Sequence, residues 1–108
     1  MRTIDTKQIE NCVYRLAGRA GLTLTDSCRA ALKDAGERET GAAAFALSAL
    51  LENEETAQRE KMPVCQDTGM AVVLLSLGQD VHLVGAPLKE AVDAGVRRAY
   101  EDGKFRKS

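Results

Sequence analysis

The segment from Pro63 to Met70, with the sequence PVCQDTGM, gathers residue types that can do chemistry. It places the thiol of Cys65, the amide of Gln66 and the carboxylate of Asp67 side by side, followed by a threonine and a glycine. Glycine and small polar residues let a backbone approach a ligand closely. A neighbouring cation favours the thiolate form of a cysteine, and a thiolate is a soft ligand for iron or another metal. The alternative is an ordinary polar turn that contains a buried thiol.

Other residues with chemical potential are scattered along the chain. Cys12 and Cys28 lie at apolar positions of helical patterns, which favours small buried side chains over metal ligands. The three cysteines form no CxxC motif and no Cys/His pair at zinc spacing, which argues against a zinc site and a disulfide framework. His82, the only histidine, is expected at the surface. Arg106 follows the last predicted helix, where its planar guanidinium could clamp a carboxylate.

Four helical patterns are expected to position these residues. Apolar spacing and start and stop signals define them. The first helix is capped by Asp5 and ends at Gly21, and the second begins at Thr25 to Ser27 and weakens at Gly36. The third runs from Thr40 to about Lys61, and the fourth from Pro87 to Gly103. Some charged residues of these helices are expected to be solvated, namely Glu52 to Glu55, Arg97, Arg98 and Lys104.

Two short apolar runs predict strands. Ala71 to Leu77 is rich in β-branched residues and leucine, which is typical of a buried strand. Val81 to Val84 alternates apolar and polar residues, and the turn from Gly78 to Asp80 predicts a hairpin between the two. The expected fold class is α/β, with an N-terminal helical layer, a short β-sheet segment and a covering helix. The Cys65 loop is expected at the end of the first strand, facing a concave surface.

Composition limits the classes of protein that the chain could be. Its 108 residues are 44% hydrophobic and 29% charged, which indicates one soluble globular domain. The net charge of −1 argues against a nucleic-acid binder. The longest apolar run, Met70 to Leu75, is too short to cross a membrane, and no signal peptide follows Met1, so a cytoplasmic location is expected. Aromatic residues make up 4%, which predicts a core small enough to need a partner.

Several motifs together resemble the N-terminal part of iron–sulfur hydro-lyases, which are the class I fumarate hydratases and the tartrate dehydratase α subunits. The motifs are CQDTGMA from Cys65, GQDV from Gly78 and the closing FRKS from Phe105. The opening MRTID and the helical GVRRAY from Gly95 are also similar, so the resemblance covers nearly the whole chain. This combination is more specific than any one short motif.

The resemblance implies a [4Fe–4S] cluster that three cysteines hold, with one open iron acting as a Lewis acid on the substrate hydroxyl. Cys65 matches the first of these cysteines. Gln66 and Asp67 match residues that contact the dicarboxylate substrate, and Asp67 is the candidate for a catalytic acid or orienting group. Arg106 matches an arginine that binds a substrate carboxylate. The other two cysteines and the threonine base of the family are expected beyond residue 108.

The implied reaction hydrates or dehydrates a C4 dicarboxylate. The resemblance leaves open fumarate and malate, a step of the tricarboxylic acid cycle, or tartrate and oxaloacetate. Residues 1–108 are expected to be a truncated N-terminal part of the α-type catalytic domain, inactive alone. A β subunit or C-terminal domain would complete the site, in a homo-oligomer or an αβ assembly.

Two alternatives stay open from the sequence. One is a non-catalytic interaction or subunit module that retains the fold, which no feature of the sequence positively supports. The other is a small redox protein that uses the Cys65 thiol, against which stands the lack of a resolving cysteine nearby.

Overall fold

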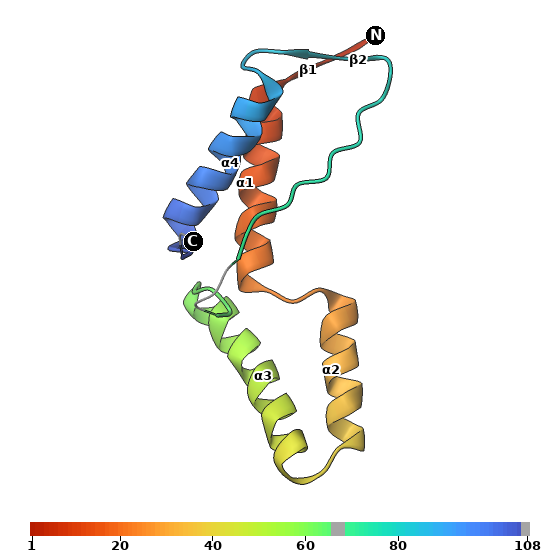
Figure 1. The fold of residues 1–108 in the computed structure, drawn as a ribbon, viewed down its shortest axis with the longest axis vertical. Helices are drawn as coiled ribbons and strands as arrows, with labels where there is room; N and C mark the ends of the chain where they lie inside the picture. Colours follow the sequence, from red (N-terminus) through yellow and green to blue (C-terminus); the bar gives the residue numbers. More distant parts are fainter. Residues whose placement is uncertain (66–68, 107–108) are drawn as a thin grey trace.

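The computed structural model describes residues 1–65 and 69–106, and it is mostly helical with one short sheet (Figure 1). Its elements are β1 (Arg2–Asp5), α1 (Thr6–Leu22), α2 (Asp26–Arg38), α3 (Gly41–Glu60), β2 (Val81–Val84) and α4 (Leu88–Gly103). This order confirms the α/β class and the four predicted helices, whose ends shift by only a few residues.

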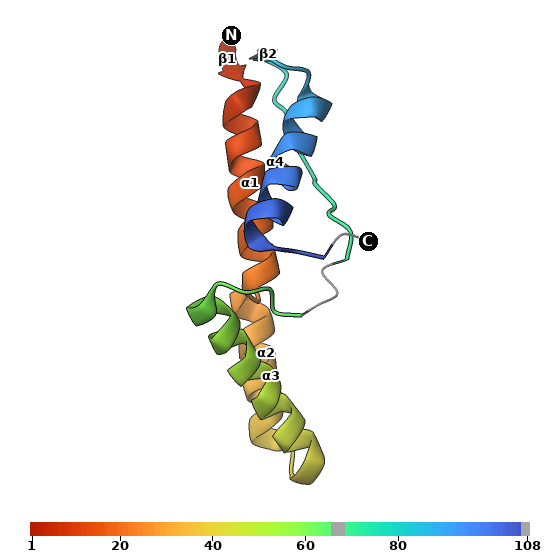
Figure 2. The same ribbon diagram turned by 90° about the vertical axis from the view of Figure 1, so that its left-hand side faces the viewer.

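The elements form two parts along a molecule of 57 × 28 × 22 Å. In the body, α4 packs along α1 and β1 pairs with β2. The arm is the antiparallel hairpin of α2 and α3, which extends away from the end of α1 (Figures 1 and 2). The predicted loop around Cys65 therefore lies in the connection that leaves the arm and returns to the body.

The first two helices begin where the sequence predicts, because side chains cap their free amides. The carboxylate of Asp5 accepts a hydrogen bond from the N–H of Lys7 at 2.8 Å. The hydroxyl of Thr25 accepts one from the N–H of Cys28 at 3.2 Å. Each cap satisfies an amide that the first helical turn leaves without a partner.

Small residues of α4 allow it to lie close to α1. Ala91, Gly95 and Ala99 recur every four residues on one face and are all buried. The approach is closest at Gly95, where an added Cβ would lie 2.6 Å from the carbonyl oxygen of Glu10 and 2.9 Å from the Cβ of Val13. The glycine is therefore required by the spacing of the two helix backbones.

We expect Gly95→Ala to lower the free energy of unfolding by about 1–2 kcal/mol. Overpacking against the α1 backbone costs about 1–3 kcal/mol, and the better helix propensity of alanine offsets up to about 1 kcal/mol of this. Urea denaturation measures the difference. Gly18→Ala is the matched control, because a Cβ at Gly18 in α1 meets nothing within 4 Å, and it should instead raise stability by up to about 1 kcal/mol. A stabilising Gly95→Ala would contradict the close approach.

The predicted hairpin is wrong. Val81–Val84 does form a strand, but it pairs in parallel with β1, with Arg2 opposite Val81 and Asp5 opposite Val84. The stretch 71–77 has no regular secondary structure, and within the described chain no strand runs beside it. A β-rich composition predicts that a segment suits a sheet, but it does not specify which strand lies alongside.

The prediction that the acidic stretch of α3 is a solvated face is wrong for Glu54, which is only 3% exposed. Its carboxylate accepts hydrogen bonds from Nε and Nη2 of Arg29 at 2.6 and 3.0 Å. It also accepts one from the N–H of Leu24 at 2.6 Å. This carboxylate therefore fastens α3 to the start of α2 and closes the base of the arm.

The free energy of unfolding should decrease as the pH falls below about 4.5, and Glu54→Gln should make that decrease shallower. Hydrogen bonds from Arg29 hold the pKa of Glu54 below its usual 4.5, and those from Lys7 and Arg98 do the same for Glu10. A carboxyl with a lowered pKa in the folded state contributes stability above its unfolded pKa, and this is lost as pH falls through the folded pKa.

Urea unfolding at several values between about pH 7 and pH 3 measures this pH dependence. Glu52→Gln is the control on the same helix, because Glu52 is exposed, and it should leave the slope unchanged. An equally steep decrease in the Glu54→Gln variant would show that the Arg29 contact contributes nothing to acid sensitivity.

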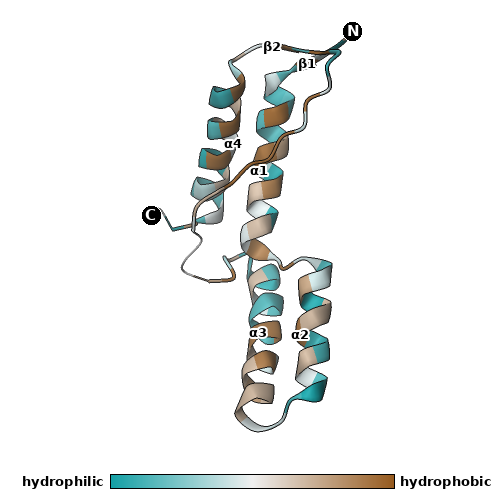
Figure 3. Cartoon of the chain, turned by 45° about the vertical axis from the view of Figure 1, so that its right-hand side comes forward, coloured by the Kyte–Doolittle hydropathy of each residue, from teal (hydrophilic) through white to brown (hydrophobic). Residues whose placement is uncertain are grey.

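The buried apolar core is small. Its members in the described chain are Val13, Ala57, Ala91, Ala99 and Phe105. Large apolar side chains are instead exposed on α3 and on residues 70–77, and Figure 3 shows this second segment as a hydrophobic strip across α1. None of the described helices combines the length and hydropathy needed to cross a membrane.

Candidate functional site

Cys65 lies in the loop that leaves α3, and hydrogen bonds fix the residue immediately before it. The N–H of Val64 donates to the carbonyl of Gly21, in the last turn of α1, at 2.9 Å. The carbonyl of Val64 accepts from the side-chain amide of Asn53 on α3 at 2.6 Å. The loop is therefore held where the body and the arm join, and Cys65 is exposed there.

The other end of the loop is tied to α4. The hydroxyl of Tyr100 donates to the carbonyl of Gly69 at 3.3 Å. Gln66 and Asp67, the residues predicted to contact substrate, lie outside the described residues. Their predicted roles and their geometry relative to Cys65 stay predictions.

Arg106 follows an anchored aromatic residue at the end of α4. Phe105 is only 5% exposed, and its N–H donates to the carbonyl of Tyr100 at 3.0 Å. The two rings meet edge to face, with centroids 5.4 Å apart. Arg106 is exposed and lies beyond the helix, and its role in binding a carboxylate stays a prediction.

Gly21 connects these two segments. The ring of Phe105 covers it so closely that an added Cβ would lie 2.3 Å from the ring carbon Cζ. The same glycine accepts the hydrogen bond from Val64. Cys65 and Arg106, far apart in the sequence, thus each follow a residue that is anchored at Gly21, and the fold brings both segments to the same end of α1.

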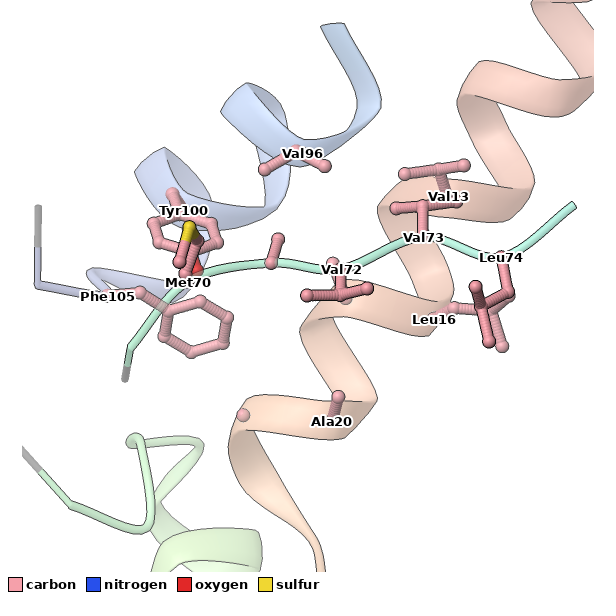
Figure 4. A pocket seen from close by; sticks show the side chains of 13 residues that line it. Val13, Leu16, Ala20, Met70, Val72, Val73, Leu74, Val96, Tyr100 and Phe105 are labelled. Carbon is pink, nitrogen blue, oxygen red and sulfur yellow. The ribbon is translucent and has the colours of Figure 1, made fainter. Parts of the chain in front are cut away.

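An apolar groove of about 340 Å³ lies directly after the Cys65 loop (Figure 4). It is formed by α1, α4, Phe105 and residues 70–74. A concave surface thus lies next to the loop, but Cys65 is not among its lining residues, and none of them is charged. A dicarboxylate would lose its hydration there without gaining ionic partners, so the groove itself does not suit such a substrate.

The burial predicted for Cys12 and Cys28 is wrong, because both are exposed. In α1 it is the Val13 side that packs on α4, and α2 buries no residue at all. Periodicity had identified helices, but not which side of each has a neighbour. Three side chains predicted to lie at the surface are exposed, namely His82, Arg97 and Lys104.

The described residues fit an iron–sulfur cluster only in part. Cys65 has the right donor atom and lies exposed in a loop, so it suits one ligand position. Within residues 1–65 and 69–106, however, no three His, Cys, Asp or Glu side chains lie close enough to hold a metal ion. Further ligands would have to come from outside the described part of this chain.

Arg98 is not the simple surface charge that the sequence suggested. Its Nη1 donates to Glu10 at 2.5 Å and to the side-chain oxygen of Asn11 at 3.0 Å, and its guanidinium lies 4.4 Å from the ring centre of Tyr14. The hydroxyl of Tyr14 donates to Asp102 at 2.5 Å, and this hydrogen bond raises the pKa of Tyr14. These contacts fix α4 on α1 and so determine where its end carries Arg106. No sequence signal could have found them without knowledge that the two helices pack together.

Comparison with known proteins gives a consistent set of matches. Residues 10–108 match the family model described as "Fumarate hydratase (Fumerase)". The chain is 29% identical over 101 residues to a putative L(+)-tartrate dehydratase subunit alpha of Methanocaldococcus jannaschii. The aligned region covers 92% of this chain and 35% of that protein. It is 26% identical over 102 residues to a putative fumarate hydratase class I of Geobacillus stearothermophilus, covering 93% of this chain and 20% of that protein. The chain therefore spans about a third and a fifth of these relatives. No solved structure matches it significantly.

Proposed function

The chain belongs to the fumarate hydratase (Fumerase) family, and from that premise we propose that it forms one part of the active site of an iron–sulfur hydro-lyase. The observation that carries the proposal is the family match over residues 10–108. The proposed reaction is the reversible addition of water to a C4 dicarboxylate. Fumarate and malate, or tartrate and oxaloacetate, are the candidate pairs, in keeping with the names of the two relatives.

Four residues carry the proposed chemistry. Cys65 supplies one thiolate ligand, supported by its exposed position in a loop held at the residue before it. Gln66 and Asp67 contact the substrate, with Asp67 as acid or orienting group, and Arg106 binds a substrate carboxylate through its planar fork. A [4Fe–4S] cluster, when bound, would supply a Lewis-acid iron that makes the substrate hydroxyl a better leaving group.

The site is completed by protein outside this chain. The relatives are about three and five times as long as the matched region, and one thiol cannot hold a cluster alone. We therefore infer that a C-terminal domain or β subunit supplies the other ligands and the base, in a homo-oligomer or αβ assembly. Residues 1–108 alone should be inactive, and a reducing, cytoplasmic compartment suits the exposed thiols.

A chimera tests the function directly. Residues 1–108 would replace the matched fifth of the Geobacillus stearothermophilus relative, and the purified chimera would be reconstituted anaerobically with iron and sulfide. Turnover of malate, fumarate or tartrate is expected from the chimera and not from residues 1–108 alone. The unmodified relative is the control for reconstitution. A folded chimera that binds iron normally but converts none of the three substrates would refute the proposal.

A further inference from the structure

Residues 70–77 form an extended segment in which the exposure of the side chains alternates. The exposed fractions are 87, 78 and 93% for Met70, Val72 and Leu74, but 42, 46 and 50% for Val73, Leu75 and Leu77. A period of two is that of a β-strand with one face on a supporting layer. Figure 4 shows the first part of the segment running across α1 beside α4. The segment thus has a strand's pattern, with its more exposed face turned to solvent.

The main chain of this segment has no sheet partner among the described residues. No main-chain hydrogen bond joins residues 70–77 to any other described residue, and the next such bond along the chain runs from the N–H of Val81 to the carbonyl of Gly78. Apolar side chains beside free N–H and C=O groups form an open strand edge, which folded proteins normally pair or cover. The groove that residues 70–74 form with α1 and α4 shows that the contact of this segment with the helices is also incompletely packed.

We propose that residues 70–77 are a docking strand, on which an apolar β-strand from the part of the enzyme outside this chain pairs. About two thirds of one relative and four fifths of the other lie outside the match, so a large partner segment exists in both. Apolar residues on both faces are typical of a strand inside a sheet that is covered on both sides. Among the described residues, α1 and α4 support only one face of this segment. The incoming part supplies a strand that pairs with its edge and covers Met70, Val72 and Leu74.

This docking has a consequence for the site. Residue 70 directly follows the loop that carries Cys65, and Gly69 is already tied to Tyr100. Pairing of the docking strand would add a second attachment at this end of the loop. Assembly of the enzyme would therefore also strengthen the attachment of the segment that carries Cys65. The inference rests on family membership and on the exposed strand, not on the identity of the substrate.

Binding and hydrogen exchange test the proposal. The probe is the part of the M. jannaschii relative outside the match, tagged and co-expressed with residues 1–108. We expect a complex in which the amides of residues 71–77 exchange at least about tenfold more slowly than in the free chain. The double variant Val72→Glu, Leu74→Glu should weaken binding at least about a hundredfold, because two apolar side chains lose their cover.

The matched control is the double variant Phe45→Glu, Leu50→Glu on the arm. These side chains are also large, apolar and exposed, at 77 and 53%, but they lie on α3, so binding should stay within about threefold. Circular dichroism and urea unfolding check that both double variants keep the fold.

Three results would overturn the proposal. The first is absence of binding, and the second is binding without slower exchange in residues 71–77. The third is a chain that is dimeric alone by light scattering and becomes monomeric with Leu74→Glu, because the occupant is then a second copy. Binding is measured without substrate, so an inactive chimera would refute the hydro-lyase proposal and leave this one standing.

Discussion

Cys65→Ser is expected to abolish both the visible absorbance and the activity of the reconstituted chimera. A serine hydroxyl is a hard, weakly acidic donor that cannot replace a thiolate on iron. Cys65 is the one cysteine of the chain that we propose as a cluster ligand, and the fold holds the residue before it through the hydrogen bonds of Val64. The readouts are the absorption spectrum and the iron content of anaerobically purified protein.

Cys12→Ser and Cys28→Ser are the matched controls for this experiment. All three thiols are exposed, so a loss confined to the Cys65 variant cannot be attributed to general thiol accessibility. The controls lie on α1 and α2 and should keep the spectrum, the iron content and the activity. Normal iron content in the Cys65→Ser protein would refute the ligand assignment.

Arg106→Lys should reduce kcat/KM on the order of 10²-fold while the cluster absorbance stays intact. A dicarboxylate in a site with little water needs cationic partners, because burying an unpaired carboxylate is costly. Lysine keeps the charge but loses the two parallel N–H donors, a difference of about 2–3 kcal/mol in charged hydrogen bonding. Steady-state kinetics on chimera with full iron content measures it.

Arg97→Lys provides the comparison for Arg106. Arg97 is exposed within α4, and no family motif assigns it to the substrate, so its replacement should change kcat/KM by less than about threefold. If the two variants behave alike, Arg106 is only a solvated charge and the motif match does not extend to its role.

The sequence predicts the local elements well, because their signals are local. Asp5 and Thr25 cap their helices through amides two and three residues away. The breaks at Thr40 and Pro87 come directly before α3 and α4. Each of these signals acts within one helical turn of the residue that carries it, so periodicity and capping rules are sufficient to find the helix ends.

Apart from the hairpin predicted between residues 71–77 and 81–84, the errors concern contacts between distant segments. Glu54 and Arg98 look like surface charges until their partners, Arg29 and Glu10, are brought to them by helix packing. Cys12 and Cys28 lie on helices as predicted, but both are exposed. Periodicity assigns a face to a helix without specifying what covers it, so these outcomes require the tertiary structure.

The candidate site was predictable only as a motif. The loop around Cys65 stands out by composition, and the resemblance assigned its chemistry. The anchoring of both site segments at Gly21 could not be foreseen, because a glycine near a helix end is ordinarily a stop signal. Here α1 continues past it, and the missing side chain makes room for the ring of Phe105.

The pairing of β1 with β2 joins segments that lie far apart in the sequence, which has a consequence for synthesis on the ribosome. Arg2 pairs with Val81, and α1 packs on α4, so the body has a high contact order. The arm, in which α2 meets the helix that follows it, can fold as soon as it emerges. At about 5–20 residues per second, translation from residue 61 to residue 103 takes roughly 2–8 s. During that interval the apolar side of α1 has no partner within the nascent chain, and it is then a target for chaperones or for aggregation.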